Sequence, residues 1–291
     1  MADTDLVFRI DAPAQPARQA EIDRLIGDEF DLDLARLDRF GRFGRDPGFV
    51  SFGGWDGEAI VAHVGLQPMG LHRGGTAVPA FGLGLATVHP ARRGRGLFRD
   101  LMERALAFAD ARVDLVLLET EEPELYHRFG FAKVAEHSFR GRLEVAAGPA
   151  AGRCLRLDVA ADVTILADLF ARRAPPSLVG GLDEHPMRFF LKALESPEIK
   201  LVHLPSLDAV VAIEPGAAGE LVLLDVVAPA IPPLAAIAAA LGGGFDRAHV
   251  FVTPDRLGWV PETVVTEATG LMARGRLPVD PRPFGLSPMH V

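Results

Sequence analysis

The sequence predicts an α/β (α+β) fold with two domains, each a mixed β-sheet flanked by helices. Strand-like and helix-like hydrophobic patterns alternate through the first 145 residues, and a similar order returns in the second half. Between the halves, residues 146–152 read Ala-Ala-Gly-Pro-Ala-Ala-Gly, a run that interrupts both patterns. The 291 residues, 49% of them hydrophobic, suffice for two folded domains. We therefore predict a first domain over 1–145, a linker over 146–153 and a second domain over 154–291.

The first half begins with a helix and two hairpins. An early amphipathic helix is indicated by apolar residues at helical spacing, namely Ile22, Leu25, Ile26 and Phe30. A hairpin is predicted at Asp56-Gly57, because Asp-Gly suits a tight two-residue turn between β-like runs. A second hairpin turn at Arg73-Gly74-Gly75 leads into a long apolar strand over 77–88.

After residue 88 the pattern changes to a helix and then returns to a strand. The helix has one apolar face, formed by Leu97, Leu101, Ala105 and Phe108, and is expected to end near Asp110. A strand over 115–118 follows, and such a crossover unit places two parallel strands in one sheet. In the second half, the same kinds of pattern predict helices around 165–170, 187–194 and 234–241 and strands over 199–204, 209–213, 221–227 and 248–253.

The turn over 89–97 reads His-Pro-Ala-Arg-Arg-Gly-Arg-Gly-Leu. Unpaired amides at the start of a helix, together with the positive end of its dipole, form a site for phosphate. Gly94 and Gly96 permit close approach of a ligand to the backbone. Positive charge is concentrated here in a chain of net charge −9, by Arg92, Arg93, Arg95 and Arg99. The alternative is a solvated basic turn that only starts a helix.

The corresponding turn in the second half lacks these features. It contains Pro229, Pro232 and Pro233, and prolines have no amide hydrogen to offer an anion. If one half carries out chemistry, we expect it to be the first.

Two motifs follow one another in the first half: Val88-His89-Pro90 with Arg93-x-x-Gly96-Leu97, and then Tyr126-His127-Arg128-Phe129-Gly130-Phe131. In this order they resemble the acetyl-CoA-dependent N-acetyltransferases of the GCN5-related (GNAT) superfamily, whose signature is a Q/R-x-x-G-x-G/A turn and a Tyr-x-x-x-Gly-Phe segment. Phe98 departs from the Gly or Ala that is usual there. With a second half that lacks the turn, the chain looks like the enhanced-intracellular-survival (Eis-like) acetyltransferases, most strongly over 58–135.

This resemblance implies two tandem acetyltransferase-like domains, of which the first is catalytic and the second degenerate. Typical members also carry a third, sterol-carrier-like domain, and we expect none within these 291 residues. Acetyl-CoA, the cosubstrate, is expected along the end of the long strand, with its pyrophosphate on the turn. The residues implied to bind it are Ala86, Thr87, Val88, Arg93, Gly94, Arg95, Gly96, Leu97 and Phe98.

Tyr126 is carried over by position as the group beside the departing sulfur. Because tyrosine has a pKa of about 10 and a thiol one of about 8.5, complete proton transfer to the thiolate is uphill, and a hydrogen bond suffices. A backbone amide near Val88 is expected to stabilise the oxyanion. The alternative for Tyr126 is an aromatic that only packs after a strand.

The attacking alkylammonium must lose a proton, so a base or a chain of waters is needed. Four glutamates precede Tyr126, and Glu119 and Glu121 are the candidates among them, although such a cluster is more often a solvated loop. In the resembling family a carboxylate of the third domain serves as base, so the resemblance transfers no base. His63 and His89 lie on or beside strands near the site, where single histidines are usually structural.

The predicted function is therefore transfer of an acetyl group to a primary amine of a small molecule or peptide. The alternative is a non-catalytic module that binds acyl-CoA and senses it. The negative net charge disfavours nucleic acid as a partner and favours cationic acceptors, including polycations. Acceptor identity, acyl-chain preference and oligomeric state, a homo-oligomer included, stay open.

Further expectations concern metals and location. No CxxC or HExxH spacing predicts a metal site, and the single cysteine, Cys154, is expected to be a small buried residue. The start of the chain does not look like a secretory signal, and prolines break the longest apolar stretch, over 221–241. We therefore expect a cytoplasmic protein without a membrane partner.

Overall fold

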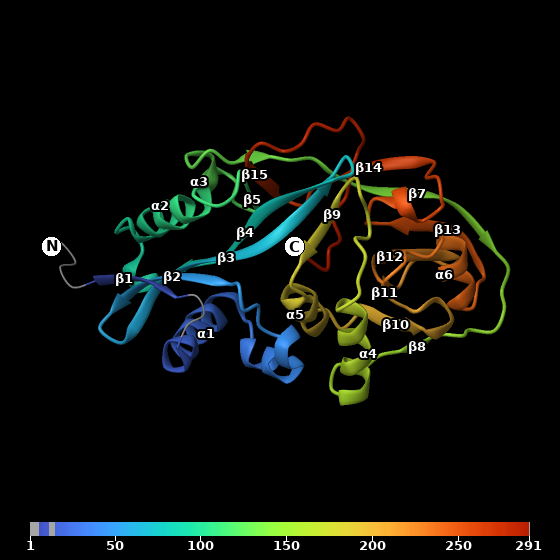
Figure 1. The fold of residues 1–291 in the computed structure, drawn as a ribbon, viewed down its shortest axis with the longest axis horizontal. Coiled ribbons are helices and arrows are strands. Elements are labelled where there is room, and N and C mark those ends of the chain that lie inside the picture. The colour runs from blue at the N-terminus through green and yellow to red at the C-terminus, as the bar shows by residue number, and fades with distance from the viewer. Residues whose placement is uncertain (1–5, 12–14, 291) are drawn as a thin grey trace. The chain divides into compact units, whose positions relative to one another are not determined.

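The computed structural model describes residues 6–11 and 15–290, which form two compact units (Figure 1). Unit 1 consists of Met1–Gly70, Pro79–Val134 and Gly270–Leu277. Unit 2 consists of Leu71–Val78, Ala135–Thr269 and Pro278–Val291. Each unit has its own mixed sheet with helices, as the sequence predicts.

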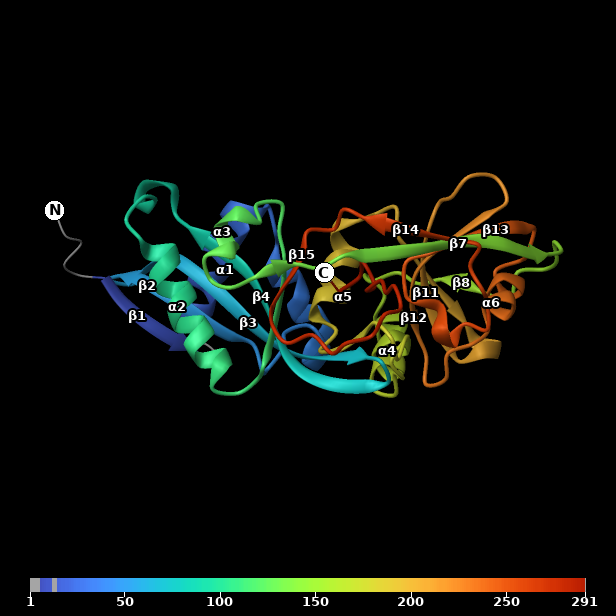
Figure 2. The same ribbon diagram turned by 90° about the horizontal axis from the view of Figure 1, so that it is seen from above.

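Unit 1 contains a sheet with the strand order β1-β2-β3-β4-β5-β15-β6. Its helices and strands are β1 (Leu6–Asp11), α1 (Pro16–Phe30), β2 (Val50–Asp56), β3 (Ala59–Arg73), β4 (Thr76–Val88), α2 (Leu97–Asp110), β5 (Leu115–Glu119), α3 (Glu124–His127), β6 (Ala132–Lys133) and β15 (Leu271–Gly275). Short 3-10 segments lie at Leu34–Phe43 and Pro90–Arg92. α1 and α2 cover opposite faces of this sheet (Figures 1 and 2).

The predicted elements of the first half are confirmed. The early helix is α1, and it buries Ile22, Leu25 and Ile26, while Phe30 is exposed. Both hairpin turns have positive φ at glycine, 60° at Gly57 and 60° at Gly74. α2 ends at Asp110, and β5 pairs in parallel with β4.

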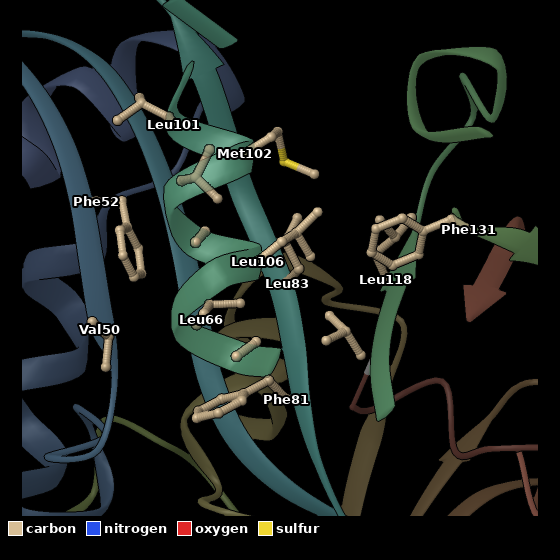
Figure 3. Close-up of a cluster of buried hydrophobic side chains, with 14 of the residues drawn as sticks. Val50, Phe52, Leu66, Phe81, Leu83, Leu101, Met102, Leu106, Leu118 and Phe131 are labelled. Carbon is tan, nitrogen blue, oxygen red and sulfur yellow. The ribbon is translucent and has the colours of Figure 1, made fainter. Parts of the chain in front are cut away.

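The core of unit 1 lies between α2 and the sheet (Figure 3). Leu101, Met102 and Ala105 of α2 are completely buried and belong to one cluster with Phe52 and Leu66. Burial of a side chain such as Leu101 is worth roughly 1.5–3 kcal/mol. This packing fixes α2, and with it the first turn of the helix, against the strands that carry the site.

Unit 2 contains a sheet with the strand order β14-β7-β13-β12-β11-β10-β8. Its helices and strands are β7 (Glu136–Val145), β8 (Arg153–Cys154), α4 (Ala160–Phe170), β9 (Gly181–Glu184), α5 (Met187–Glu195), β10 (Lys200–Leu204), β11 (Ala209–Glu214), β12 (Glu220–Val227), α6 (Leu234–Ala240), β13 (Phe245–Val250) and β14 (Thr263–Glu267). Of these strands, β9 pairs with β3 and is not part of the seven-stranded sheet. Further 3-10 segments are Pro205–Leu207 and Pro254–Arg256. The predicted helices are confirmed, and the last predicted strand lies three residues earlier, as β13.

The compact units are not two consecutive halves of the chain, because strands are exchanged between them. β7 follows unit 1 in the sequence but pairs with β13 and β14 in the sheet of unit 2. β15 follows unit 2 in the sequence but pairs with β5 and β6 in the sheet of unit 1. Residues 146–152, where the sequence predicts the domain boundary, connect β7 to β8 within unit 2. The breaker run marks a connection between strands there.

Cys154 is exposed, so the expectation that it is buried was wrong. It lies in the two-residue strand β8 at the edge of the sheet, where it pairs with Val202, and an edge strand leaves side chains open to solvent. Over residues 6–11 and 15–290, the helices are too short or too polar to cross a bilayer.

Candidate active site

The turn between β4 and α2 has the conformation that an anion-binding helix start requires. Gly94 has φ 76° and Gly96 has φ 84°, values that glycine adopts without strain. Gly96 is the N-cap of α2 and, as a glycine, has no side chain to accept an amide of the first turn. A Cβ at position 94 would meet no atom within 4 Å, so space is open beside the backbone. The unpaired amides and the helix dipole therefore favour a bound phosphate group.

Two arginines of this turn are held by the protein itself. Arg92 forms an ion pair with Asp56 at the end of β2. Arg93 forms an ion pair with Glu29 of α1, and its Nε donates to the carbonyl of Val88 at 3.0 Å. Arg93 thus joins the turn to β4 and α1. With these charges partly neutralised, the backbone amides carry more of the expected attraction for an anion than the sequence suggests.

Tyr126 lies in α3 among aromatic rings. The ring of Phe98 meets it edge-on at 5.8 Å, and that of Phe131 at 6.1 Å. Burial raises the pKa of Tyr126 above its ordinary value, and the charge of Glu122 adds to this. The phenol is consequently neutral near pH 7 and able to donate a hydrogen bond. Phe98, in the first turn of α2, thus packs against the Tyr126 ring at the position where the resembling family usually has a small residue.

The strands beside the turn separate before they end. β4 and β5 pair in parallel at Phe81 with Val116 and at Gly82 with Leu117. Among the described residues this pairing stops there, although β4 continues to Val88. The end of β4 therefore has backbone groups that a ligand strand can meet, as the sequence-based interpretation requires. Thr87 is buried at 4% exposure, and its hydroxyl has no hydrogen-bond partner among the described residues.

Leu85, just before this stretch, has a left-handed backbone with φ 51°. For a residue with a side chain this conformation costs about 1–2 kcal/mol. Its carbonyl lies 2.8 Å from Nδ1 of His63, which is completely buried in β3. Burial lowers the pKa of His63 to about 4, against smaller opposing effects of the Leu85 carbonyl and Asp23. The imidazole is neutral at pH 7.

Leu85 and the partners of the arginines were not predicted from the sequence. One signal was present: a buried polar residue is almost always hydrogen-bonded, and His63 stands within an apolar strand run. Glu29 and Asp56 left no such signal, because their contacts with the turn join residues far apart in the chain.

The structure places the two candidate bases in the segment between β5 and α3. Glu119 is the last residue of β5 and pairs with Leu271 of β15, and both Glu119 and Glu121 are exposed. Glu122, whose charge acts on the pKa of Tyr126, is also exposed. The assignment of a base to Glu119 or Glu121 stays a prediction.

Among its described residues, unit 2 lacks an equivalent of this turn. In unit 2, α6 connects the parallel strands β12 and β13. The first amide of that helix, at Leu234, donates to the carbonyl of Leu257 at 2.8 Å. Pro233 precedes it without an amide hydrogen. Over the described ranges, no group of three or more His, Cys, Asp or Glu residues could hold a metal ion.

Sequence comparison finds similarity to acetyltransferases. Residues 46–134 match the family model of the acetyltransferase (GNAT) domain. An uncharacterized N-acetyltransferase of Streptomyces avermitilis is 34% identical over 137 residues, which cover 43% of this chain and 32% of that protein. The match thus spans about a third of the length of this curated relative.

Solved structures share the fold over most of the chain. Eis1 from Mycobacterium abscessus is 17% identical with a TM-score of 0.57, covering 92% of this chain and 73% of that one. A probable N-acyltransferase from Enterococcus faecalis V583 is 17% identical with a TM-score of 0.58, covering 93% and 72%. A GCN5-related N-acetyltransferase from Kribbella flavida is 21% identical with a TM-score of 0.51, covering 92% and 72%. These likenesses confirm the predicted fold class.

Proposed function

We propose that the protein is an N-acetyltransferase that moves an acetyl group from acetyl-CoA to a primary amine, a proposal supported by the match of residues 46–134 to the acetyltransferase (GNAT) domain model. The observation that carries this proposal is the open first turn of α2, which follows β4 and contacts Tyr126 through Phe98. An anion site beside a neutral phenol suits a thioester whose carrier bears a diphosphate. The open space at Gly94 supports the fit.

In the proposed reaction the amine attacks the thioester carbon directly. The N–C bond forms, the C–S bond breaks with its electron pair leaving on sulfur, and the nitrogen releases its extra proton to the thiolate or to water. An amide at the end of β4 stabilises the oxyanion, and the Tyr126 hydroxyl donates a hydrogen bond to the leaving thiolate. Since burial raises the pKa of Tyr126, full proton transfer from the phenol is even less favourable than for an ordinary tyrosine.

The acceptor is expected to be a cation before it reacts. An alkylammonium has a pKa near that of lysine, about 10.4, and must lose a proton to attack. Glu119 or Glu121 would receive this proton, directly or through water, and the exposed glutamates before Tyr126 would attract a polycationic small molecule or peptide. This assignment rests on their position along the chain.

Replacement of Tyr126 by phenylalanine is expected to lower kcat about 10- to 100-fold and to change the KM for acetyl-CoA little. The variant keeps the ring that packs against Phe98 and removes only the hydroxyl. Thiol release from acetyl-CoA, measured against polyamines, aminoglycosides and peptides, gives both constants. If no acceptor exceeds the blank while acetyl-CoA still raises the Tm, the protein is a sensor of acyl-CoA and the proposal fails.

A further inference from the structure

Leu85 has a conformation that nothing in its own sequence favours. Among the described residues, positive φ values outside glycine occur at Asp31, Leu85 and Asp208. The two aspartates are C-caps, of α1 and of the 3-10 segment Pro205–Leu207, where this residue type tolerates a left-handed backbone. Leu85 instead lies inside strand β4. Such a residue persists only where its surroundings hold it.

His63 holds Leu85 in this conformation through a hydrogen bond that requires one tautomer of its ring. The Leu85 carbonyl can only accept, so Nδ1 of His63 carries the hydrogen and donates across 2.8 Å. The neutral ring therefore has an acceptor at Nε2, and the hydroxyl of Ser51 lies 3.2 Å from it as donor. Ser51, His63 and Leu85 belong to β2, β3 and β4, so three adjacent strands are joined by side chains at this level. The ring of Phe49 stacks beside His63 at 6.4 Å.

We propose that His63 is a positioning residue for acetyl transfer, which holds Leu85 left-handed and thereby aims the amides of residues 86–88 at the thioester. This inference rests on the proposed function. β4 is tied to the rest of the sheet on both sides of Leu85, by its pairs with β5 at Phe81 and Gly82 and by the amide of His89, which donates to Val61 at 2.9 Å. Between these two points, Leu85 is the residue at which the backbone of β4 departs from regular strand geometry.

Relaxation of Leu85 to an extended backbone would turn the following residues toward the opposite face of the sheet. Ala86 and Val88 now pack against the cluster under α2 that also contacts Phe98 and Tyr126. A change in their direction would displace the amides relative to Tyr126, and a misplacement of about 1 Å can reduce a rate about 100-fold. His63 itself is completely buried with both nitrogens engaged, which excludes direct contact with the acceptor amine.

The test uses replacements that separate the hydrogen bond from the ring. His63→Leu removes the donor, and we expect kcat to fall about 10- to 100-fold. His63→Asn retains an N–H near the place of Nδ1 and should keep most of the wild-type kcat. The decisive variant combines His63→Leu with Leu85→Gly, because glycine adopts positive φ without support. We expect the kcat of this double variant to be at least about fivefold higher than that of His63→Leu.

A second buried histidine provides the matched control. His249 in unit 2 is 7% exposed, and its Nε2 lies 2.8 Å from the hydroxyl of Ser138. His249→Leu should lower the Tm as His63→Leu does, and leave the KM for acetyl-CoA and kcat unchanged. A purely structural role for His63 would make the two leucine variants alike in both constants and would contradict the proposal.

Two further results would also overturn it. One is no recovery in the His63→Leu, Leu85→Gly pair. The other is a His63→Asn enzyme whose kcat is as low as that of His63→Leu and whose residual activity has lost one limb of its pH profile, which would indicate a base. If the wild-type protein transfers acetyl groups to no amine, the proposed function fails separately. The positioning role is then tested on the dissociation constant of acetyl-CoA in place of kcat. His63→Leu should raise this constant at least about tenfold, and the added Leu85→Gly should restore it. Equal dissociation constants for the wild type and both variants would refute the positioning role.

Discussion

Replacement of Gly94 by aspartate is expected to raise the KM for acetyl-CoA by more than about tenfold, with little change in kcat. The substitution places a carboxylate in the open space beside the first turn of α2, where the proposed pyrophosphate would lie. Two like charges at that separation repel, and the aspartate would also compete for the same amides. Steady-state kinetics at varied acetyl-CoA concentration measures the effect.

Gly75 provides the control for backbone strain. It has φ 81°, against 76° at Gly94, and a Cβ at either position meets no atom within 4 Å. Gly75→Asp therefore introduces the same residue with a similar backbone penalty in the hairpin between β3 and β4. Its KM should equal that of the wild type. Equal KM values for Gly94→Asp and the wild type would show that no anion binds at this turn.

The largest expected loss of stability comes from a buried charge cluster in unit 2. Nη2 of Arg173 lies 2.6 Å from Oδ1 of Asp225, and His290 lies 2.8 Å from both Asp225 and Glu184. Burial alone would raise the pKa of Asp225, but the charge of Arg173 and the hydrogen bond from His290 lower it. These carboxylates raise the pKa of His290 against the effect of its burial and of the Arg173 charge. The buried Asp225 carboxylate is therefore held in its charged form by Arg173 and His290 and depends on both.

Arg173→Met should lower the free energy of unfolding by roughly 3–5 kcal/mol, because it leaves buried carboxylates without their cation. The corresponding fall in Tm is on the order of 10 °C for a domain of this size. Arg172→Met is the matched control, since the neighbouring Arg172 pairs with Asp208 on the surface, at 50% and 55% side-chain exposure. Its Tm should stay near that of the wild type. Thermal unfolding with equal Tm values for the two variants would contradict this account of the cluster.

The sequence predicts the local elements of this protein well, because their signals are short in range. The apolar stripe of α1 and the glycines of the two hairpins act within a few residues, and the structure confirms them. The turn over 89–97 is equally local: its two glycines and the helix after it determine its conformation. The residues of the candidate site that lie on this turn could therefore be named from the sequence.

Features that depend on pairing across the chain could not be predicted in this way. Because β7 and β15 are exchanged between the units, residues far apart in the chain, such as Glu119 and Leu271, pair with each other. The hydrophobic pattern of such a strand is the same whichever sheet it joins. The ion pair of Arg93 with Glu29 and the left-handed Leu85 beside His63 likewise result from strands and helices that meet only in the fold. Local composition carries no information about such partners.

The central claim is that the amides at the start of α2 bind the diphosphate of CoA, and titration calorimetry tests it most directly. CoA and pantetheine share the pantetheine arm, but pantetheine lacks both the diphosphate and the phosphorylated adenosine. Titration of Gly94→Asp with CoA, which changes only the turn, therefore accompanies the comparison and should also show weaker binding. We predict a measurable heat and saturation with CoA, and binding at least about 100-fold weaker for pantetheine. Equal affinities for the two ligands, or no heat with CoA at millimolar concentration, would contradict the account.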